Sequence, residues 1–429
     1  MRIIYPFALL LLLSCTSHAR TFLHKEPLFF AKEVARWERT QNAALAHGQH
    51  HKGWIECVGF ALMANRIRFV SSCFALAVAL DRPLAYRGVH HSRYTPGSKN
   101  EPETDALHEA IMSAFALPYE LPLTAPAAAI HTGIWEIDWT DPDARSLFTC
   151  RDLKTELNEK VKIRISGTFY FLPFLLNNPS FRDYFVDLAP RRNAVSLFVR
   201  HLFRPSQQVA QRKDRVAQAL GLRDASFVLG LQIRNGDSQQ KGYSASQPTG
   251  WVSREELRLV KRLAQELAPR HLQDRLVYLV AADTDKGLQI SQQVLGSRIR
   301  SARNEQSAEI AEAVVDILLL ADADALILSY WSSFGELAWI LGEHDHVHIV
   351  TDVGGNAAAP TCGNPQYINF ANVNLVGHDD AFTASLRVEG PATFSCAEYV
   401  SFAQKLSCFE PSMVEGAFSH LGQTRLGVA

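Results

Sequence analysis

One segment constrains the fold of this chain more than any other, the apolar run at residues 227–233. Seven largely apolar residues, Phe-Val-Leu-Gly-Leu-Gln-Ile, end abruptly at Arg234-Asn235-Gly236-Asp237. A run of this length that stops at a turn signal predicts a strand buried on both of its faces. Ligands of open parallel sheets bind beyond the carboxyl ends of the strands, so Arg234 is expected at the mouth of a cleft. Its planar fork of donors suits phosphate oxygens, while a surface turn that pairs Arg234 with Asp237 is the simpler alternative.

The chain downstream of this segment alternates between helix-like and strand-like patterns. The spacing of apolar residues predicts helices over residues 254–267, 287–294, 309–320 and 332–341. Buried strands are predicted over residues 276–281, 325–329 and 347–351, with another near 298–301. Strands that alternate with helices through short connections imply right-handed crossovers, and hence an α/β fold with a parallel sheet.

A second α/β pattern precedes this one. Residues 57–60 lead to Asn65 and Arg66, to a helix over residues 67–80 and to a strand near 84–86. The free amides of a helix N-terminus attract anions, so Asn65 and Arg66 are candidate anion ligands, and a helix cap with a surface arginine is the alternative. The polar amphipathic stretch at 206–220 is interpreted as the connection between two domains, over residues 20–220 and 221–429.

The overall charge argues against two classes of protein. The 429 residues are 47% hydrophobic and 20% charged, as in a folded globular protein. Lysine plus arginine (43) nearly cancels aspartate plus glutamate (44). Binders of nucleic acid or of a membrane surface need an excess of positive charge, so neither partner is predicted.

The first 19 residues have the composition of an export signal. Arg2 is followed by an apolar run over residues 3–13 and by small and polar residues up to Ala19. This pattern predicts a secretory signal cleaved before Arg20, with a short signal anchor or a lipoprotein signal at Cys15 as alternatives. The predicted location is the secretory pathway. Six cysteines remain after cleavage, and their even number permits disulfides whose pairing stays open.

Metal ligation has only weak candidates. The histidines at 47, 50 and 51 fit a solvated loop more simply than a metal site, and Asp322 and Asp324 fit a turn and a helix cap. Asp283 and Asp285 are better placed, but two carboxylates alone are a weak signal. No metal site and no cofactor are therefore predicted. The chain also contains no Gly-x-Gly-x-x-Gly, Walker or Gly-x-Ser-x-Gly sequence, which disfavours dinucleotide oxidoreductases, P-loop enzymes and α/β-hydrolases.

Three loops are predicted at strand ends of one sheet, and together they suggest a diphosphate site. They begin at Arg234, at Asp283 and just before Ser332, and the third enters a helix through Ser332-Ser333-Phe334-Gly335. Small hydroxyl side chains and free amides at a helix N-terminus cradle phosphate without a metal. Asp283 is placed to bond ribose hydroxyls or a base edge.

Five short motifs, in order along residues 54–349, resemble those of the plant-type xyloglucan α-1,2-fucosyltransferases. They are Cys57-Val-Gly59 with Asn65-Arg66, Tyr170-Phe-Leu-Pro173 with Pro179-Ser-Phe181, His201-Leu-Phe-Arg-Pro205, Gly230-Leu-Gln-Ile-Arg234 and Trp331-Ser-Ser-Phe-Gly335. The resemblance implies a GT-B enzyme, in which an acceptor-side domain and a GDP-sugar domain enclose the donor. It also implies metal-independent, inverting transfer of fucose from GDP-fucose to a galactose hydroxyl of a cell-wall-type glycan, in the Golgi.

The resemblance also assigns roles to particular residues. Arg234 would bind the GDP diphosphate, and Ser332, Ser333, Phe334 and Gly335 would line the nucleotide site together with Asn65 and Arg66. Asp237 is the acidic residue nearest to Arg234 in sequence, either as a catalytic group or as a residue that orients Arg234.

The chain departs from the family pattern in the C-terminal segment around Cys408-Phe-Glu-Pro411 and in its short N-terminal apolar run, and two further departures concern the site. Gly59 and Asn65 are separated by five residues where the family has a tight Gly-x-Gly-Asn-Arg, and Thr168-Phe169 stand where many members carry Asp-Asn. The second of these two removes an acidic candidate for activating the acceptor. The alternative function is therefore a secreted, non-catalytic protein that binds a glycan or a nucleotide sugar on a transferase scaffold.

Overall fold

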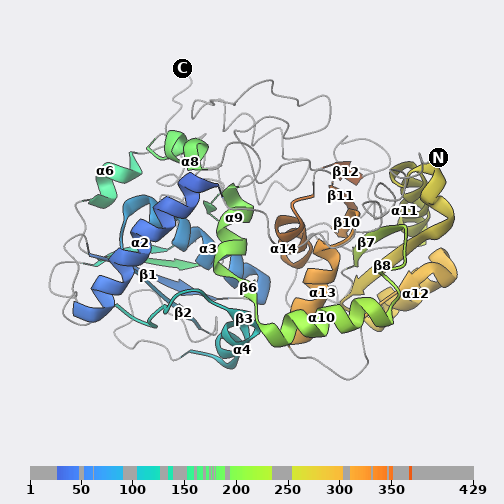
Figure 1. Ribbon diagram of the computed structural model, residues 1–429, viewed down its shortest axis with the longest axis horizontal. Coiled ribbons are helices and arrows are strands. Elements are labelled where there is room, and N and C mark those ends of the chain that lie inside the picture. Colours follow the sequence, from blue (N-terminus) through green and yellow to red (C-terminus); the bar gives the residue numbers. More distant parts are fainter. Residues whose placement is uncertain are drawn as a thin grey trace, which may run out of the picture.

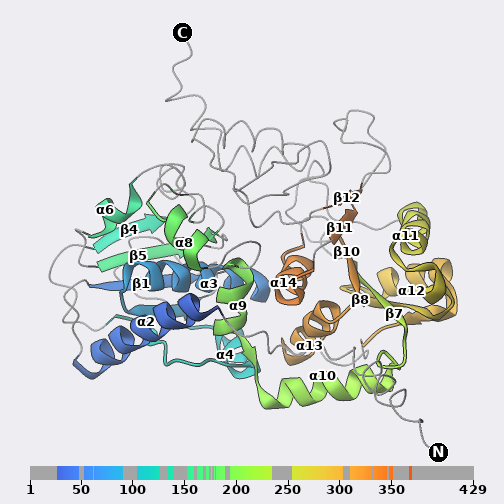
Figure 2. The ribbon, with the colours of Figure 1, turned by 45° about the horizontal axis from the view of Figure 1, so that its top comes forward.

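The structure is a computed structural model of the whole chain, and it shows two α/β units side by side (Figures 1 and 2). It describes residues 27–47, 53–60, 62–89, 104–125, 134–138, 152–158, 162–167, 171–172, 175, 178, 180–188, 194–233, 254–302, 310–329, 332–344, 347–350 and 367–369. Predictions for the export signal, Arg234, Asp237 and the C-terminal tail fall outside these residues.

The N-terminal unit is built on a sheet of four parallel strands. Its strands are β1 (Trp54–Gly59), β2 (Leu84–Gly88), β4 (Ile134–Asp138) and β5 (Lys162–Gly167), in the order β2-β1-β5-β4. The helices of this unit are α2 (Leu28–His47), α3 (Met63–Leu80), α4 (Ala106–Ala114), α6 (Leu153–Asn158), α8 (Arg182–Leu188) and α9 (Ala194–Leu202). A two-stranded antiparallel pair, β3 (Phe115–Ala116) and β6 (Arg204–Pro205), lies beside α4.

Helix α3 is the core of the N-terminal unit. Its aromatic residues Phe69 and Phe74 are fully buried, and Cys73 forms a disulfide with Cys57 of β1 across a Cα–Cα distance of 6.5 Å. This bond confirms the prediction of disulfide bonding. Among the described helices α3 is also the one long and apolar enough to cross a membrane, but 89% of it is buried inside the protein. Its hydrophobicity is therefore that of a core helix.

The C-terminal unit has a six-stranded sheet of order β12-β11-β10-β7-β8-β9. The strands are β7 (Phe227–Ile233), β8 (Leu276–Ala282), β9 (Ile299–Arg300), β10 (Ala325–Ser329), β11 (Val347–Val350) and β12 (Tyr367–Asn369). The helices are α11 (Arg254–Leu267), α12 (Asp285–Leu295), α13 (Ile310–Ala321) and α14 (Ser333–Gly342), with short 3-10 helices at Arg270–Arg275 and Gly296–Arg298. This strand order is that of a doubly wound dinucleotide-binding fold.

The predicted parallel sheet is confirmed for all five strands that the sequence predicts, and the structure adds a sixth strand, β12, at its edge. Strands β7 to β11 pair in parallel, as their apolar sequences and helical connections predict. Strand β12 runs antiparallel to β11, with Ile349 paired to Ile368. An antiparallel edge strand on a parallel sheet is common in doubly wound folds and leaves the central strands unchanged.

The two units are joined by α10 (Gln207–Ala219) and by direct packing. Helix α10 lies beneath α13 in both views (Figures 1 and 2). It corresponds to the stretch at residues 206–220 that was predicted to connect the domains. A single hydrophobic cluster runs from α3 and α9 of the first unit into α13 and α14 of the second. The predicted boundary at residue 220 lies between the two sheets and stays a prediction.

Candidate functional site

The candidate site lies where the connections of the second sheet reverse direction. Strand β7 pairs with β8 on one side and with β10 on the other. Because β7 connects onward to β8 and β10 connects onward to β11, right-handed crossovers take the two connections to opposite faces of the sheet. Such a switch point opens a crevice at the carboxyl edge, which is where ligands bind in this class of sheet. Strand β7 ends at Ile233, immediately before Arg234, and β10 ends at Ser329, three residues before Ser332.

A buried glutamine ties these two strand ends together. Gln232 is 5% exposed, and its Oε1 accepts a hydrogen bond from the backbone amide of Ser329 at 3.2 Å. In return the Ser329 hydroxyl donates to the backbone oxygen of Gln232 at 2.9 Å. A Cβ at Gly335 would lie 3.1 Å from the same Oε1. Gln232 therefore fixes the end of β7 against both β10 and the first turn of α14.

The start of α14 has the features of an anion-binding helix terminus. Ser332 is the N-cap, and its hydroxyl accepts from the amide of Gly335 at 3.4 Å. Ser333 and Phe334 are partly exposed in the first turn. The remaining first-turn amides and the positive end of the helix dipole together favour a negatively charged ligand. The structure thus places all four of the predicted residues 332–335 at one helix terminus.

Asp283 lies at the neighbouring strand end. Its backbone amide donates to the oxygen of Ile233 at 3.1 Å, so the loop after β8 meets the last residue of β7. The side chain of Asp283 is exposed, and Thr284 caps α12 by accepting from Gly287. Asp283 therefore borders the same carboxyl edge as the residue that precedes Arg234. Its predicted contact with ribose or base stays a prediction.

The N-terminal unit reaches this edge through the first turns of α3. Asn65 is partly exposed, and its Oδ1 accepts from Arg68 Nη2 at 2.9 Å. Arg68 also forms an ion pair with Glu336 in the first turn of α14. The predicted residue Asn65 is thus brought close to residues 332–335, although it comes from the other unit.

Arg66 is buried inside the N-terminal unit. It is 2% exposed, and its two terminal nitrogens hydrogen-bond the carboxylate of Asp105 at 2.6 and 2.5 Å. Nη2 also donates to the backbone oxygen of Val89 at 3.0 Å. A Cβ at Gly88 would lie 2.7 Å from Nη1, so the glycine makes room for this arginine. This geometry gives Arg66 a structural role, and its predicted contact with a nucleotide stays untested.

Two titratable neighbours of Arg66 respond to this environment. The hydrogen bonds from Arg66 hold the pKa of Asp105 below its usual value, more than burial raises it. Burial lowers the pKa of His108, whose Nδ1 accepts from the amide of Gly88 at 3.0 Å. A charged Asp105 and a neutral His108 are therefore the forms that fit this network.

The described residues contain no group of three or more histidine, cysteine or acidic side chains arranged to hold a metal ion. Asp324 Oδ2 accepts from the amide of Val228 at 2.8 Å, and Asp322 pairs with Lys213 at 2.6 Å. Asp324 therefore ties the turn before β10 to β7, and Asp322 ties it to α10; neither of these two contacts is the predicted helix cap.

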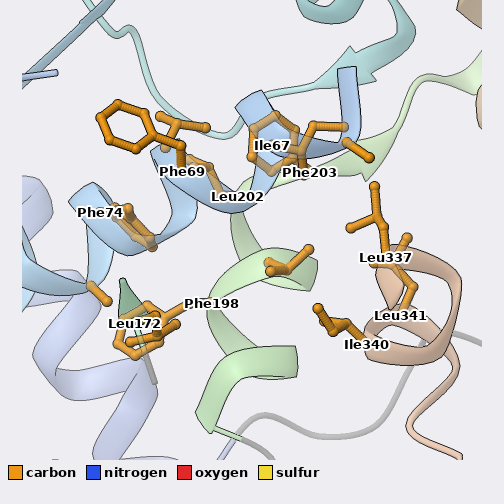
Figure 3. Close-up of a cluster of buried hydrophobic side chains, with 14 of the residues drawn as sticks. Ile67, Phe69, Phe74, Leu172, Phe198, Leu202, Phe203, Leu337, Ile340 and Leu341 are labelled. Atoms are coloured by element: carbon orange, nitrogen blue, oxygen red, sulfur yellow. The ribbon is translucent and has the colours of Figure 1, made fainter. Parts of the chain in front are cut away.

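Helix α14 is held in place by the N-terminal unit along its whole length. Figure 3 shows Leu337, Ile340 and Leu341 facing residues of α3 and α9. Ser196 Oγ of α9 donates to the backbone oxygen of Ile340 at 2.7 Å, and Arg200 of α9 pairs with Glu343 at 2.9 Å. The orientation of the candidate anion-binding helix is therefore set by both units.

No protein-family model matches the chain. Among curated proteins, probable fucosyltransferase 7 of Arabidopsis thaliana is 27% identical over 248 residues, which are 53% of this chain and 46% of that protein. Putative fucosyltransferase 10 of the same plant is 25% identical over 220 residues, 47% of this chain and 42% of that protein. The chain thus spans a little under half the length of these relatives. Among solved structures, a variant of Arabidopsis thaliana FUT1 in complex with GDP has a TM-score of 0.56 at 17% identity, covering 76% of this chain and 80% of that one.

The two-unit fold, with a switch point in its second sheet, is the GT-B fold, as predicted. Within this class, the similarity to named plant fucosyltransferases confirms the resemblance seen in the motifs.

The structure also identifies site residues that the sequence analysis missed. They are Gln232, Arg68 and Glu336. The sequence could have indicated Gln232, because it is the one polar side chain within the apolar run of β7. No feature of the sequence indicates Arg68 and Glu336, since only the packing of α3 against α14 brings them together.

Proposed function

We propose that this chain is a fucosyltransferase that uses GDP-fucose as its donor. The observation that carries the proposal is the switch point of the second sheet, where the strand preceding Arg234 is locked through Gln232 to a serine-capped helix terminus. The similarity to proteins named fucosyltransferases supports fucose as the sugar. The nucleotide in the structure of the similar FUT1 variant is GDP, which supports GDP as the carrier.

The proposed reaction is a single displacement at the anomeric carbon of fucose with inversion. The oxygen of the acceptor hydroxyl forms a bond to that carbon as the bond between the carbon and the β-phosphate oxygen breaks. GDP leaves with the electron pair of the broken bond, and the hydroxyl proton is released to solvent water. Negative charge grows on the β-phosphate in the transition state. Arg234 and the amides at the start of α14 stabilise this charge, and such groups typically contribute several kcal/mol. No metal is required in this scheme.

The acceptor is proposed to be a galactose hydroxyl of a cell-wall-type glycan, in an α-1,2 linkage. Asn65 lies on the N-terminal unit and accepts a hydrogen bond from Arg68, which pairs with Glu336 of α14. This contact between the units supports an acceptor site between them. Asp237 is the proposed acidic partner of Arg234, and the proposed location is the Golgi lumen or membrane.

A transfer assay tests this function. The purified protein is incubated with GDP-fucose and a panel of galactose-terminated oligosaccharides, with and without EDTA, and products are analysed by mass spectrometry and NMR. We expect a product heavier by one fucosyl residue, of inverted anomeric configuration, at the same rate in EDTA. Loss of transfer in EDTA would contradict metal independence. GDP-fucose binding without transfer to any acceptor would favour the non-catalytic alternative.

A further inference from the structure

We propose that Arg68 is a positioning residue for the donor site, which acts by neutralising Glu336 in the first turn of α14. The inference rests on the proposed function, because the anion concerned is the donor diphosphate. Neither residue belongs to the motifs that carry the resemblance to fucosyltransferases.

The contacts of Arg68 connect the two units. One terminal nitrogen, Nη1, is paired with the carboxylate of Glu336, and the other, Nη2, donates to Asn65 Oδ1 at 2.9 Å. The side chains of Arg68 and Glu336 are 11% and 27% exposed, so solvent has limited access to the pair. Arg68 thus places one full positive charge of the N-terminal unit beside the start of α14.

The negative charge of Glu336 would oppose anion binding at the start of α14, and Arg68 neutralises that charge. A carboxylate in the first turn of a helix interacts favourably with the positive end of the dipole, which is the same end that a diphosphate would use. An unpaired Glu336 would also repel the diphosphate, with little screening in a partly buried position. Because Arg68 cancels that charge, the terminus formed by Ser332 to Gly335 remains attractive to an anion.

Arg66 cannot replace Arg68 in this role. Arg66 is committed to Asp105 within the N-terminal unit, and successive residues of a helix are rotated by about 100°. Arg68 is two residues after Arg66, so its side chain leaves α3 on nearly the opposite side of the helix from that of Arg66. The sequence motif contains Arg66, whereas the geometry assigns the donor-side charge to Arg68.

A charge cycle tests the inference by calorimetric titration with GDP in low salt and EDTA. The proteins are the wild type, Arg68→Met, Glu336→Gln and the double variant. Relative to the wild type, Arg68→Met leaves one extra negative charge at the terminus, Glu336→Gln leaves one extra positive charge, and the double variant leaves none. We expect Arg68→Met to weaken GDP binding about tenfold, Glu336→Gln to strengthen it severalfold and the double variant to restore it. These differences should shrink in 0.5 M NaCl.

Two controls separate this effect from general damage. Arg200→Met breaks the matching ion pair with Glu343 at the other end of α14, and it should leave GDP affinity within about twofold because that end is roughly 15 Å away. Arg68→Lys keeps the charge and should bind GDP nearly as well as the wild type. Thermal melting of every variant reports on folding independently of GDP.

The outcomes are distinguishable. A double variant as weak as Arg68→Met would overturn the inference, since Arg68 would then contact GDP itself. Unchanged affinity in Arg68→Met or weaker binding in Glu336→Gln would also overturn it. A folded wild type that binds no GDP would instead overturn the proposed function on which the inference rests.

Discussion

The central strands of the two sheets differ in the kind of side chain that they bury. In the C-terminal sheet, β7 and β10 are lined almost entirely by apolar side chains. In the N-terminal sheet, the fully buried Glu56 of β1 is surrounded by three buried cations. Lys162 approaches it at 2.6 Å, Arg164 at 3.0 Å and Arg87 at 3.4 Å. The central strands of the C-terminal sheet are held mainly by apolar packing, whereas those of the N-terminal sheet also depend on a buried charge cluster.

The charge cluster links three adjacent strands. Arg164 lies beside Glu56 in the register of β5 against β1, and Arg87 reaches it from β2. A buried ion pair is a weak source of net stability, but removing one partner leaves the other charges uncompensated. The N-terminal sheet should therefore be far more sensitive to a single polar substitution than the C-terminal sheet.

The largest expected effect is that of Glu56→Leu. It leaves three buried cations without their carboxylate and should lower the free energy of unfolding by about 3–5 kcal/mol. The control Ile327→Val in β10 removes one buried methylene and should cost only about 0.5–1.5 kcal/mol. Urea unfolding followed by circular dichroism measures both. Equal losses for the two variants would mean that the cluster does not distinguish the sheets.

Loss of the disulfide between Cys57 and Cys73 should have the next largest effect on stability. Replacing Cys57 and Cys73 together by alanine removes a cross-link over 16 residues and should destabilise the N-terminal unit by about 3 kcal/mol. Hydrogen exchange with mass spectrometry should show faster exchange in β1 and α3, and unchanged exchange in β7 and β10. Equal acceleration in both sheets would instead show that the two units unfold together.

A substitution in the C-terminal sheet should have a smaller effect. Gly230 of β7 leaves no room for a side chain, because a Cβ would lie 2.6 Å from Leu326 Cδ2 and 3.1 Å from Ala323 Cβ. Gly230→Ala should therefore cost about 1–3 kcal/mol through overpacking. Urea unfolding checks this value, and a stabilised variant would contradict the tight packing of β7 against α13.

The smallest expected effect is a pH dependence confined to the N-terminal unit. The pKa of His108 is lowered by burial in the folded state, so the folded protein binds fewer protons than the unfolded chain. Stability should therefore fall as the pH drops below about 6.5, the unfolded value. His108→Asn keeps an acceptor near Gly88 and should flatten this part of the curve. A thermal-melting series from pH 7.5 to 5 that is identical in both proteins would exclude His108 as the cause.

The same contrast explains how far the sequence could predict the fold. Helix 254–267 and strand 325–329 have the predicted bounds, because their periodicity matches their burial. Strand β5 was not predicted, and the alternation of Lys162, Arg164 and Ser166 with Ile163 and Ile165 would in any case indicate a strand with one solvated face. All six residues are buried, and the partner of the charged face, Glu56, is over a hundred residues away in sequence. The alternation of residue types along a strand shows which face is polar, but it does not show whether that face meets solvent or a buried partner from elsewhere in the chain.

The site shows the same limit. Residues 332–335 could be predicted, since helix caps and phosphate-binding termini are local features. The choice of Arg68 over Arg66 could not be made from sequence, because it depends on which side of α3 meets Asp105 and which side meets α14.

The central claim is that the switch point of the second sheet binds GDP through Arg234. Calorimetric titration of wild type, Arg234→Ala and Arg275→Ala with GDP and GDP-fucose, all in EDTA, tests it most directly. Arg275 is an exposed arginine at the opposite edge of the same sheet and serves as the matched control. The account predicts micromolar binding by the wild type and by Arg275→Ala, and at least about hundredfold weaker binding by Arg234→Ala, since a charged hydrogen-bonding partner is lost. Equal binding by all three proteins, or no binding by a folded wild type, would contradict it.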